Sequence, residues 1–95
     1  MVKLSELYLE YTTLVEENQE IITQMSNEDQ LDLYSYFKQA EVGDCNIDAP
    51  MFYEIRQKAK YNAWNNLMGM SKNDAKKHYI KKVKELLEVV EENDN

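Results

Sequence analysis

Turn-forming residues are scarce in this chain, which has two glycines and one proline among 95 residues. A sandwich or barrel of many short strands needs frequent turns, and glycine and proline supply most of them. Long helices joined by a few connections need far fewer. The 43% hydrophobic content is ample for one compact core, and the length leaves no room for a second. The sequence therefore predicts a single all-α domain.

Apolar residues recur at three- and four-residue spacing in the first half of the chain, as they do on one face of a helix. The first such stretch predicts a helix over 4–23. A second helix is expected to start at Ser26, which stands three residues before Asp29 in a variant of the capping box. It is expected to end at Gly43, where a left-handed residue closes many helices.

The second half predicts one loop and two further helices. Residues 43–50 have turn formers and no apolar period, so they form the loop. The third helix is expected to place Phe52, Ile55, Ala59 and Ala63 on one face and to stop at Gly69. The fourth is expected to start at the Ser71 and Asp74 cap and to carry Ala75, Tyr79, Val83, Leu86, Leu87 and Val90. We expect one domain over 1–90 and a frayed acidic tail over 91–95.

Side chains that support catalysis or metal binding are few. The single cysteine, Cys45, cannot form an intramolecular disulfide, and one cysteine with one histidine does not make a metal site. His78 lies among lysines and is typical of a solvated helix surface. Because no nucleophile has a base beside it, the sequence predicts a non-catalytic protein without metal or cofactor.

The N-terminal segment has polar residues where a signal peptide has an unbroken apolar core, and no run approaches the ~20 apolar residues of a membrane span. The sequence therefore predicts a cytoplasmic protein that does not insert stably into membranes.

Charge is distributed unevenly along the chain. The net charge of −7 taken alone disfavours binding to nucleic acid or to anionic lipid. Between Arg56 and Lys84, however, nine basic residues accompany a single acid, Asp74. We expect this stretch to meet a polyanion. Repulsion from the acidic remainder disfavours a long nucleic-acid backbone, so a compact polyphosphate ligand is the better fit.

Aromatic residues accompany these bases, with Tyr61 and Trp64 near Lys60 and Tyr79 one turn past Lys76. A nucleotide base stacked on a ring, with its phosphates held by lysine and arginine, would use both features. Two plainer interpretations stay open. The aromatics can be core residues, which we prefer for Trp64. The lysines can be solvated helix residues, and Lys81, Lys82 and Lys84 are expected to pair with Glu85 and Glu88.

One segment of the chain resembles a known family. The stretch from Tyr34 to Asp44, YSYFKQAEVGD, is followed by Pro50 and then by KAKYNAW at residues 58–64, with Gly69, Ser71, Ala75 and Tyr79 beyond it. This spaced pattern is similar to that of the acyl-CoA-binding protein family and covers residues 31–87.

The resemblance implies a four-helix bundle that binds medium- and long-chain fatty acyl-CoA thioesters without catalysis, as an intracellular buffer and carrier, and as a monomer. It implies that Tyr34, Lys38, Lys60 and Tyr79 hold the nucleotide end, with the 3′-phosphate near the first three. Arg56 would reach the phosphates, and Leu31 would line the acyl path. Phe37 stands where the family usually has tyrosine and would stack on adenine.

An alternative from another class is a helical interaction module whose apolar groove takes a partner's amphipathic helix. It explains the apolar helix faces but gives no role to the basic stretch between Arg56 and Lys84. Acyl-CoA combines phosphate charges with a hydrocarbon chain, and its binder needs a basic patch beside an apolar groove. The surfaces of Val15, Leu31 and Tyr34 could provide that groove.

Overall fold

The computed structural model describes residues 3–88, and its elements over that range are all helices. They are α1 (Leu4–Glu17), α2 (Gln19–Ile22), α3 (Asn27–Glu41), α4 (Ile55–Asn65) and α5 (Lys72–Leu87). The predicted all-α fold is confirmed. The expectations for Val90 and for the tail over 91–95 lie outside the described residues.

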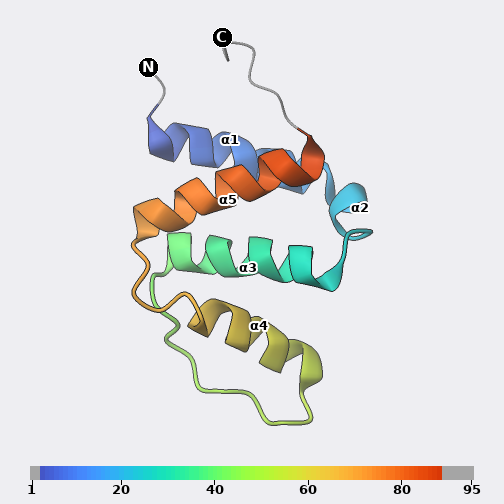
Figure 1. Ribbon diagram of the computed structural model, residues 1–95, viewed down its shortest axis with the longest axis vertical. Coiled ribbons are helices and arrows are strands. Elements are labelled where there is room, and N and C mark those ends of the chain that lie inside the picture. The colour runs from blue at the N-terminus through green and yellow to red at the C-terminus, as the bar shows by residue number, and fades with distance from the viewer. Residues whose placement is uncertain (1–2, 89–95) are drawn as a thin grey trace.

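The helices pack in an order that differs from their order in the sequence. α3 packs against α5 on one side and α4 on the other, while α5 also packs against α1. Figure 1 shows the resulting succession along the long axis: α1, α5, α3, α4. The molecule is accordingly elongated, with extents of 48 × 29 × 19 Å. α1 and α4 therefore lie toward opposite ends.

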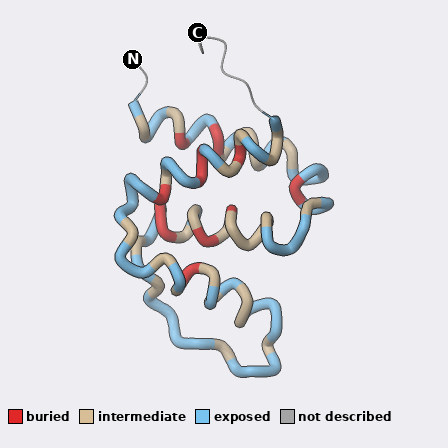
Figure 2. The backbone as a smooth tube through the Cα atoms, viewed as in Figure 1, coloured by how far each residue is buried: buried red, intermediate tan, exposed pale blue. Residues whose placement is uncertain are grey.

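The core lies where α1, α3 and α5 meet, and Figure 2 shows buried residues along all three. The face predicted for the fourth helix is confirmed in its first three turns, because Ala75, Tyr79 and Val83 are all buried. α4 contributes Trp64, which is 1% exposed. The larger buried set consists of Tyr8, Tyr11, Ile22, Leu33, Ala40, Ala75, Tyr79, Ile80 and Val83.

Both predicted helix caps are present. The Ser26 hydroxyl accepts a hydrogen bond from the Asp29 amide at 3.1 Å, and the Ser71 hydroxyl accepts one from the Asp74 amide at 3.0 Å. Each satisfies a backbone donor that the first helical turn leaves unpaired, which stabilises a helix by about 1 kcal/mol. Gly43, with φ of 96°, follows the end of α3 as expected.

The helix predicted over 4–23 is interrupted at Asn18. There the backbone leaves the helical region, at φ −121° and ψ 31°, and α2 starts at the next residue. The Asn18 side chain donates to the Leu14 carbonyl at 2.7 Å, and its backbone amide donates to the Val15 carbonyl at 3.1 Å. Such local bonds compete with the regular helical pattern. The prediction of one continuous helix was wrong for this reason.

The third helix starts later than its apolar pattern predicted. α4 begins at Ile55, and the predicted face residues Phe52 and Ile55 are 88% and 76% exposed. Residues 51–54 form a turn in which the Glu54 amide donates to the Met51 carbonyl at 2.9 Å. The Glu54 carboxylate also accepts from the Met51 amide at 2.8 Å. This turn replaces a first helical turn, so its side chains do not reach the core.

Lys82 was expected to pair with glutamates of its own helix and instead bridges two helices. Its ammonium lies 2.9 Å from an Asp29 oxygen and 3.2 Å from an Asp32 oxygen, both on α3. Lys84 lies over the ring of Tyr11 on α1, 5.9 Å from its centroid. These contacts arise because α5 packs between α1 and α3, which the sequence alone did not show.

Candidate functional site

Four of the predicted site residues lie on α3 at helical spacing. Tyr34, Phe37 and Lys38 are three or four residues apart and therefore share one side of the helix. Leu31 is one turn earlier. Tyr34, Lys38 and Leu31 are half-buried, and Phe37 is 39% exposed. α3 packs against α4 on one side and α5 on the other. The residues on this side of α3 can therefore act together with residues of both helices.

Two lysines and two rings meet where α3 packs against α4. The Lys60 ammonium lies 5.4 Å from the centroid of the Tyr34 ring, and the Lys38 ammonium lies 4.9 Å from that of the Trp64 ring. We call these four residues the cation–ring seam. Cation–π contacts at accessible sites are worth about 0.5 to 1 kcal/mol, so either ammonium can turn from its ring to a phosphate at small cost.

A second line of aromatic contacts runs from the same side of α3 across α5 to α1. The rings of Phe37 and Tyr79 have centroids 6.3 Å apart with 50° between their planes. Tyr79 in turn meets Tyr8 edge-on, at 5.4 Å and 66°. Tyr79 is only 3% exposed, whereas Phe37 keeps an accessible surface. Phe37 can therefore offer a ring to a ligand while Tyr79 supports it from the core.

Tyr8 is a residue of this neighbourhood that the sequence did not indicate. It is 6% exposed, and the Lys76 ammonium lies 5.6 Å from its ring centroid. Lys76 belongs to the basic stretch that the sequence singled out. Tyr8 contacts it only because α1 packs on α5. Burial, followed by the nearby Glu41 carboxylate, raises the pKa of Tyr8, so its phenol stays protonated at neutral pH.

Two further phenols are held neutral. Burial, with a smaller contribution from the Glu16 carboxylate, raises the pKa of Tyr79 to about 12. Burial also raises the pKa of Tyr34, with Cys45 as the lesser cause. A neutral phenol can donate a hydrogen bond to a phosphate or carbonyl oxygen without adding negative charge. Both tyrosines therefore suit an anionic ligand.

Arg56 and Leu31 are less closely connected to the other predicted residues. Arg56 is exposed on α4, one turn before Lys60, and Leu31 lies one turn before Tyr34 on α3. Within residues 3–88, no hydrogen bond, ion pair or ring contact joins either one to the rest of the site. Their roles stay predictions.

Trp64 fixes the position of α4 against the end of α3. Its indole N–H donates to the Gly43 carbonyl at 2.8 Å, across 21 residues of sequence. Its burial confirms the preference for Trp64 as a core residue. The same ring also supports the Lys38 ammonium, so it belongs to the packing and to the seam at once.

Asp44 and Gln39 fasten the same end of α3 to the turn between α4 and α5. One Asp44 carboxylate oxygen accepts from the Gly69 amide at 2.8 Å and from the Gln39 side-chain amide at 2.9 Å. The fully buried Gln39 side chain also donates to the Met70 carbonyl at 2.8 Å. These bonds, with that from Gly69 the larger cause, lower the pKa of Asp44. These hydrogen bonds therefore hold the end of α3, which carries two residues of the cation–ring seam, to the turn that follows α4.

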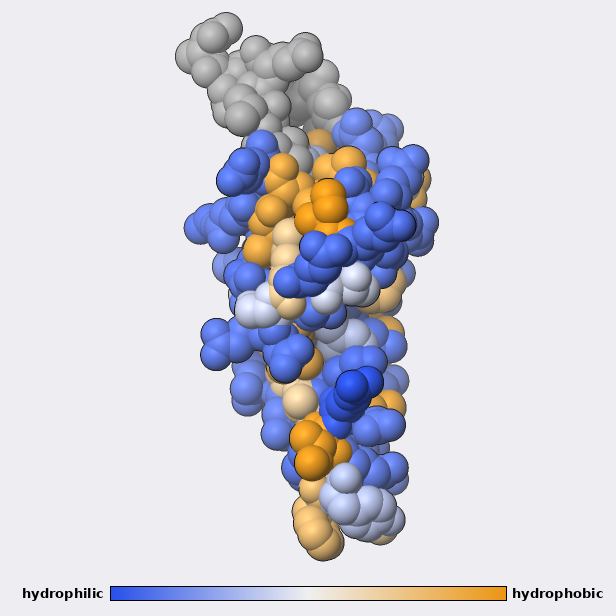
Figure 3. All heavy atoms as spheres, turned by 90° about the vertical axis from the view of Figure 1, so that its right-hand side faces the viewer, coloured by the Kyte–Doolittle hydropathy of each residue, from blue (hydrophilic) through white to orange (hydrophobic). Residues whose placement is uncertain are grey.

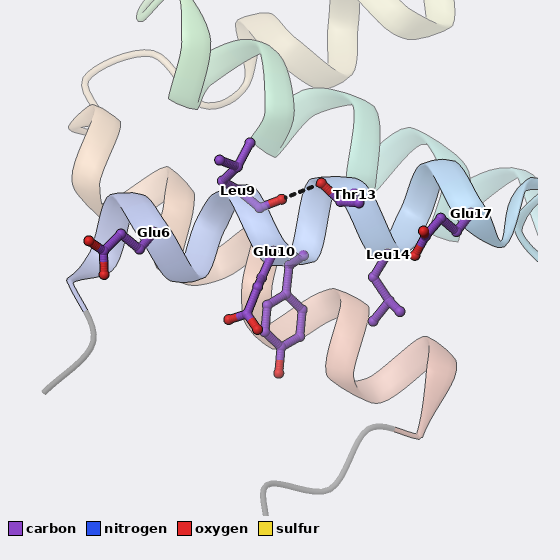
Figure 4. A pocket seen from close by; sticks show the side chains of 7 residues that line it. Glu6, Leu9, Glu10, Thr13, Leu14 and Glu17 are labelled. Carbon is purple, nitrogen blue, oxygen red and sulfur yellow. Dashed lines mark hydrogen bonds between the residues drawn. The ribbon is translucent and has the colours of Figure 1, made fainter.

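One open hollow on the described surface lies away from the predicted site. It has a volume of about 540 Å³ and is lined by α1 residues, among them Glu6, Glu10 and Glu17. In Figure 4, Glu10 and Glu17 border it, and the Thr13 hydroxyl donates to the Leu9 carbonyl at 2.9 Å. Three carboxylates would repel a polyphosphate. The hollow lies on α1, whereas the cation–ring seam lies where α3 packs against α4.

Residues 3–88 contain neither a cluster of metal ligands nor a membrane-spanning helix. No three histidine, cysteine, aspartate or glutamate side chains are placed to share a metal ion. None of the helices in that range has both the length and the apolar character needed to cross a bilayer. Cys45 is a half-buried free thiol.

Comparisons with known proteins agree on one family. The family model "Acyl CoA binding protein" matches residues 5–83. The acyl-CoA-binding protein of Dictyostelium discoideum is 53% identical over 55 residues, which cover 58% of this chain and 66% of the relative.

Two solved structures share the fold as well as the sequence pattern. Acyl-CoA-binding protein 2 of Oryza sativa superposes with a TM-score of 0.80 at 37% identity, covering 90% of this chain and 92% of that one. The acyl-CoA-binding protein of Moniliophthora perniciosa gives 0.79 at 34% identity, covering 86% and 78%. With most of its length matched by the family model and by both structures, this chain belongs to the acyl-CoA-binding protein family.

Proposed function

We propose that this protein binds medium- and long-chain fatty acyl-CoA thioesters without catalysing a reaction, and that it buffers and carries them in the cytoplasm. The observation that carries the proposal is the cation–ring seam, where two ammonium groups and two rings from α3 and α4 meet. A nucleotide offers the matching chemistry, because it pairs phosphate charges with an aromatic base.

Each predicted residue has a role in this arrangement. Lys38 and Lys60 hold the 3′-phosphate beside the Tyr34 hydroxyl, and the accessible ring of Phe37 stacks on adenine. Tyr79 supports Phe37 from within, at 6.3 Å between ring centroids. The exposed guanidinium of Arg56, one helical turn before Lys60, reaches the remaining phosphates.

The acyl chain needs an apolar surface next to the phosphate site. Leu31, Tyr34 and Val15 are half-buried, so each side chain packs partly inside the protein and leaves part of its surface accessible to an acyl chain. Each methylene that is fully buried contributes up to ~0.8 kcal/mol. Lengthening the chain from eight to sixteen carbons therefore adds at most about 6 kcal/mol, and less where part of the chain stays in water.

Calorimetry with palmitoyl-CoA, free CoA and free palmitate tests the proposal. The thioester should bind far more tightly than either half, because only the thioester occupies both the seam and the apolar surface. A parallel thioesterase assay should show no release of CoA. Equal affinity for CoA and palmitoyl-CoA would reject the acyl groove, and failure of all three to bind would favour a protein-interaction module instead.

A further inference from the structure

A second hollow, smaller than the one on α1, lies where α1 packs on α5. It has a volume of about 210 Å³ and is lined by Leu4, Leu7, Lys77, Ile80, Lys81 and Lys84, which we call the lysine-rimmed hollow. Its three aliphatic residues are buried or half-buried and form an apolar floor. Its charged residues are all lysines, whereas three glutamates line the other hollow. The lysine-rimmed hollow therefore favours a partner that is both apolar and anionic.

Two of these lysines carry charges that the described part of the chain leaves without an ion pair. Lys77 and Lys81 are exposed and lie one helical turn apart on the same side of α5. Neither forms an ion pair within residues 3–88. Lys82, by contrast, pairs with two aspartates of α3. The ammonium groups of Lys77 and Lys81 are therefore available to an anionic partner.

The size and shape of the lysine-rimmed hollow favour a helix over other occupants. Its volume of about 210 Å³ is below the roughly 300 to 1,000 Å³ of pockets that enclose small molecules, so it has room for one or two side chains. Its floor is recessed between lysines, which a protruding side chain can reach and a flat bilayer surface cannot. Figure 3, which shows the side of the molecule that carries α2, has a similar mixture in its upper half, where apolar residues lie between hydrophilic ones. An amphipathic helix presents apolar anchors with charged residues beside them.

We propose that the lysine-rimmed hollow docks an acidic amphipathic helix of a partner protein. One or two apolar side chains of that helix enter the hollow against Leu4, Leu7 and Ile80, and carboxylates beside them pair with Lys77 and Lys81. The docking does not depend on the proposed function. Its use, which is to bring the carrier to a protein that supplies or consumes acyl-CoA, rests on that function.

The lysine-rimmed hollow and the cation–ring seam lie on different pairs of helices. The hollow is lined by residues of α1 and α5, whereas the seam is built from α3 and α4. A partner helix and an acyl-CoA can therefore be bound at the same time. Saturation with palmitoyl-CoA should leave the affinity for the partner helix unchanged.

Titration of the full chain with synthetic peptides tests the docking. The probe is a peptide of about 14 residues, or about four helical turns, with leucine at every third or fourth position and glutamate elsewhere. One comparison peptide has glutamine in place of glutamate, and the other has serine in place of leucine. Both should bind more weakly, because the first lacks the charges and the second lacks the apolar anchors. In the NMR spectrum of isotope-labelled protein, the probe should shift the amides of residues 77–84 and leave those of α4 in place.

Charge reversal at the rim is the second test. Lys81→Glu should weaken binding of the probe by about 2- to 30-fold, because it turns an exposed ion pair into a like-charge contact. Lys72→Glu is the matched control, since it changes the net charge equally on the same helix but does not line the hollow. It should bind the probe as wild type does. The docking is overturned if wild type does not bind the probe, or if Lys72→Glu loses as much affinity as Lys81→Glu.

Two other occupants of the lysine-rimmed hollow would give different results. If a second copy of this chain filled it, wild type alone would self-associate in sedimentation experiments and Lys81→Glu would not. If lipid filled it, wild type would float with phosphatidylserine vesicles and Lys81→Glu would not. Either result would overturn the docking of a partner helix, as would displacement of the probe by palmitoyl-CoA.

Calorimetry with palmitoyl-CoA separates this proposal from the function on which its use rests. Lys81→Glu should bind palmitoyl-CoA as wild type does, because Lys81 lies outside the cation–ring seam. Binding of the probe with no binding of palmitoyl-CoA by wild type would overturn the proposed function and leave the docking intact. Binding of palmitoyl-CoA with no binding of the probe would do the reverse.

Discussion

The Lys60 side chain links α4 to α3 through the ring of Tyr34, 5.4 Å from its centroid. We predict that Lys60→Ala weakens palmitoyl-CoA binding by about 10- to 150-fold, because a charged hydrogen bond contributes roughly 1.5 to 3 kcal/mol. Titration with palmitoyl-CoA and with its 3′-dephospho analogue measures the effect. The dephospho ester should bind Lys60→Ala and wild type alike.

The matched control is Lys81→Ala, which removes an exposed lysine of α5 that lies away from the cation–ring seam. It should bind palmitoyl-CoA as wild type does. If Lys60→Ala still prefers the 3′-phosphorylated ligand as strongly as wild type, Lys60 does not hold that phosphate.

Phe37 can contribute to packing of the fold, to ligand binding, or to both, and substitutions at this position separate the two roles. Phe37→Tyr keeps the ring and should change palmitoyl-CoA affinity little through stacking, with any gain coming from a new hydrogen bond of ~0.5 to 1.5 kcal/mol. Phe37→Ala removes the ring and should cost ~1 to 3 kcal/mol of binding, as base–aromatic stacking does elsewhere. Calorimetry on the three proteins gives the order.

Thermal unfolding of the ligand-free proteins is the control for Phe37. The side chain is 39% exposed, so Phe37→Ala should destabilise the fold by less than the ~3 to 5 kcal/mol that a fully buried phenylalanine costs. A variant that loses that much stability yet binds palmitoyl-CoA normally would identify Phe37 as a packing residue.

At the scale of whole elements, the ion pairs of Lys82 join α5 to the first turns of α3. Hydrogen bonding to Lys82, followed by that to Ser26, lowers the pKa of Asp29 below its ordinary value of 3.8. The ionised carboxylate therefore stabilises the fold above that value, and this stabilisation is lost as the pH falls through the lowered pKa. Asp29 is also the first cause of a raised pKa at Lys82, whose contribution is lost only as the pH rises above 10.5.

We predict that wild type loses thermal stability on acidification below about pH 4, and that Lys82→Gln loses less over the same range because Asp29 has no ammonium partner left. Unfolding temperatures measured from neutral pH downward test this. Lys81→Gln changes a neighbouring lysine that has no ion pair within residues 3–88 and should keep the wild-type acid dependence. An identical dependence in Lys82→Gln would show that the pair contributes nothing.

The elements that the sequence predicted well are those set by local chemistry. Ser26 and Ser71 cap their helices as expected, and the spacing of Ala75, Tyr79 and Val83 identified the buried face of α5. The same spacing failed at Phe52, because the turn closed by Met51 and Glu54 takes those residues out of the helix.

The candidate site was predictable to the extent that it lies within single helices. Tyr34, Phe37 and Lys38 share one side of α3 by spacing, and the family pattern added Lys60. The pairing of Lys38 with Trp64 and the presence of Tyr8 were not predictable, since both depend on how separate helices pack. Periodicity shows which side of a helix is buried but does not show which neighbour covers it.

At the scale of the whole molecule, α4 contributes fewer buried residues than the other long helices do. It packs on α3 and contributes one buried residue, Trp64, whereas α5 packs on both α1 and α3. Regions with few buried contacts open locally at lower free energy than the global fold. A ligand that bridges Lys60 with Tyr34 and Lys38 would oppose that opening.

We predict that palmitoyl-CoA slows amide hydrogen exchange most in α4. At a free concentration one hundred times Kd, the ligand adds about 2.7 kcal/mol, so exchange through openings that break the site should slow by up to about 100-fold. Exchange mass spectrometry with and without ligand compares α4 with α1. Equal slowing in the two helices would mean that the ligand does not act by holding α4 to α3.

The bonds from Trp64 to Gly43 and from Gly69 to Asp44 close residues 45–68 at their base. These two hydrogen bonds hold the end of α3 next to the start of the connection to α5. The segment between them is therefore anchored at both of its ends. Doubling the length of a flexible loop costs only about 0.6 kcal/mol once its ends are fixed. The stretch 45–50 is therefore a permissive place for insertions, where the chain can gain or lose residues while α1, α3 and α5 keep their packing.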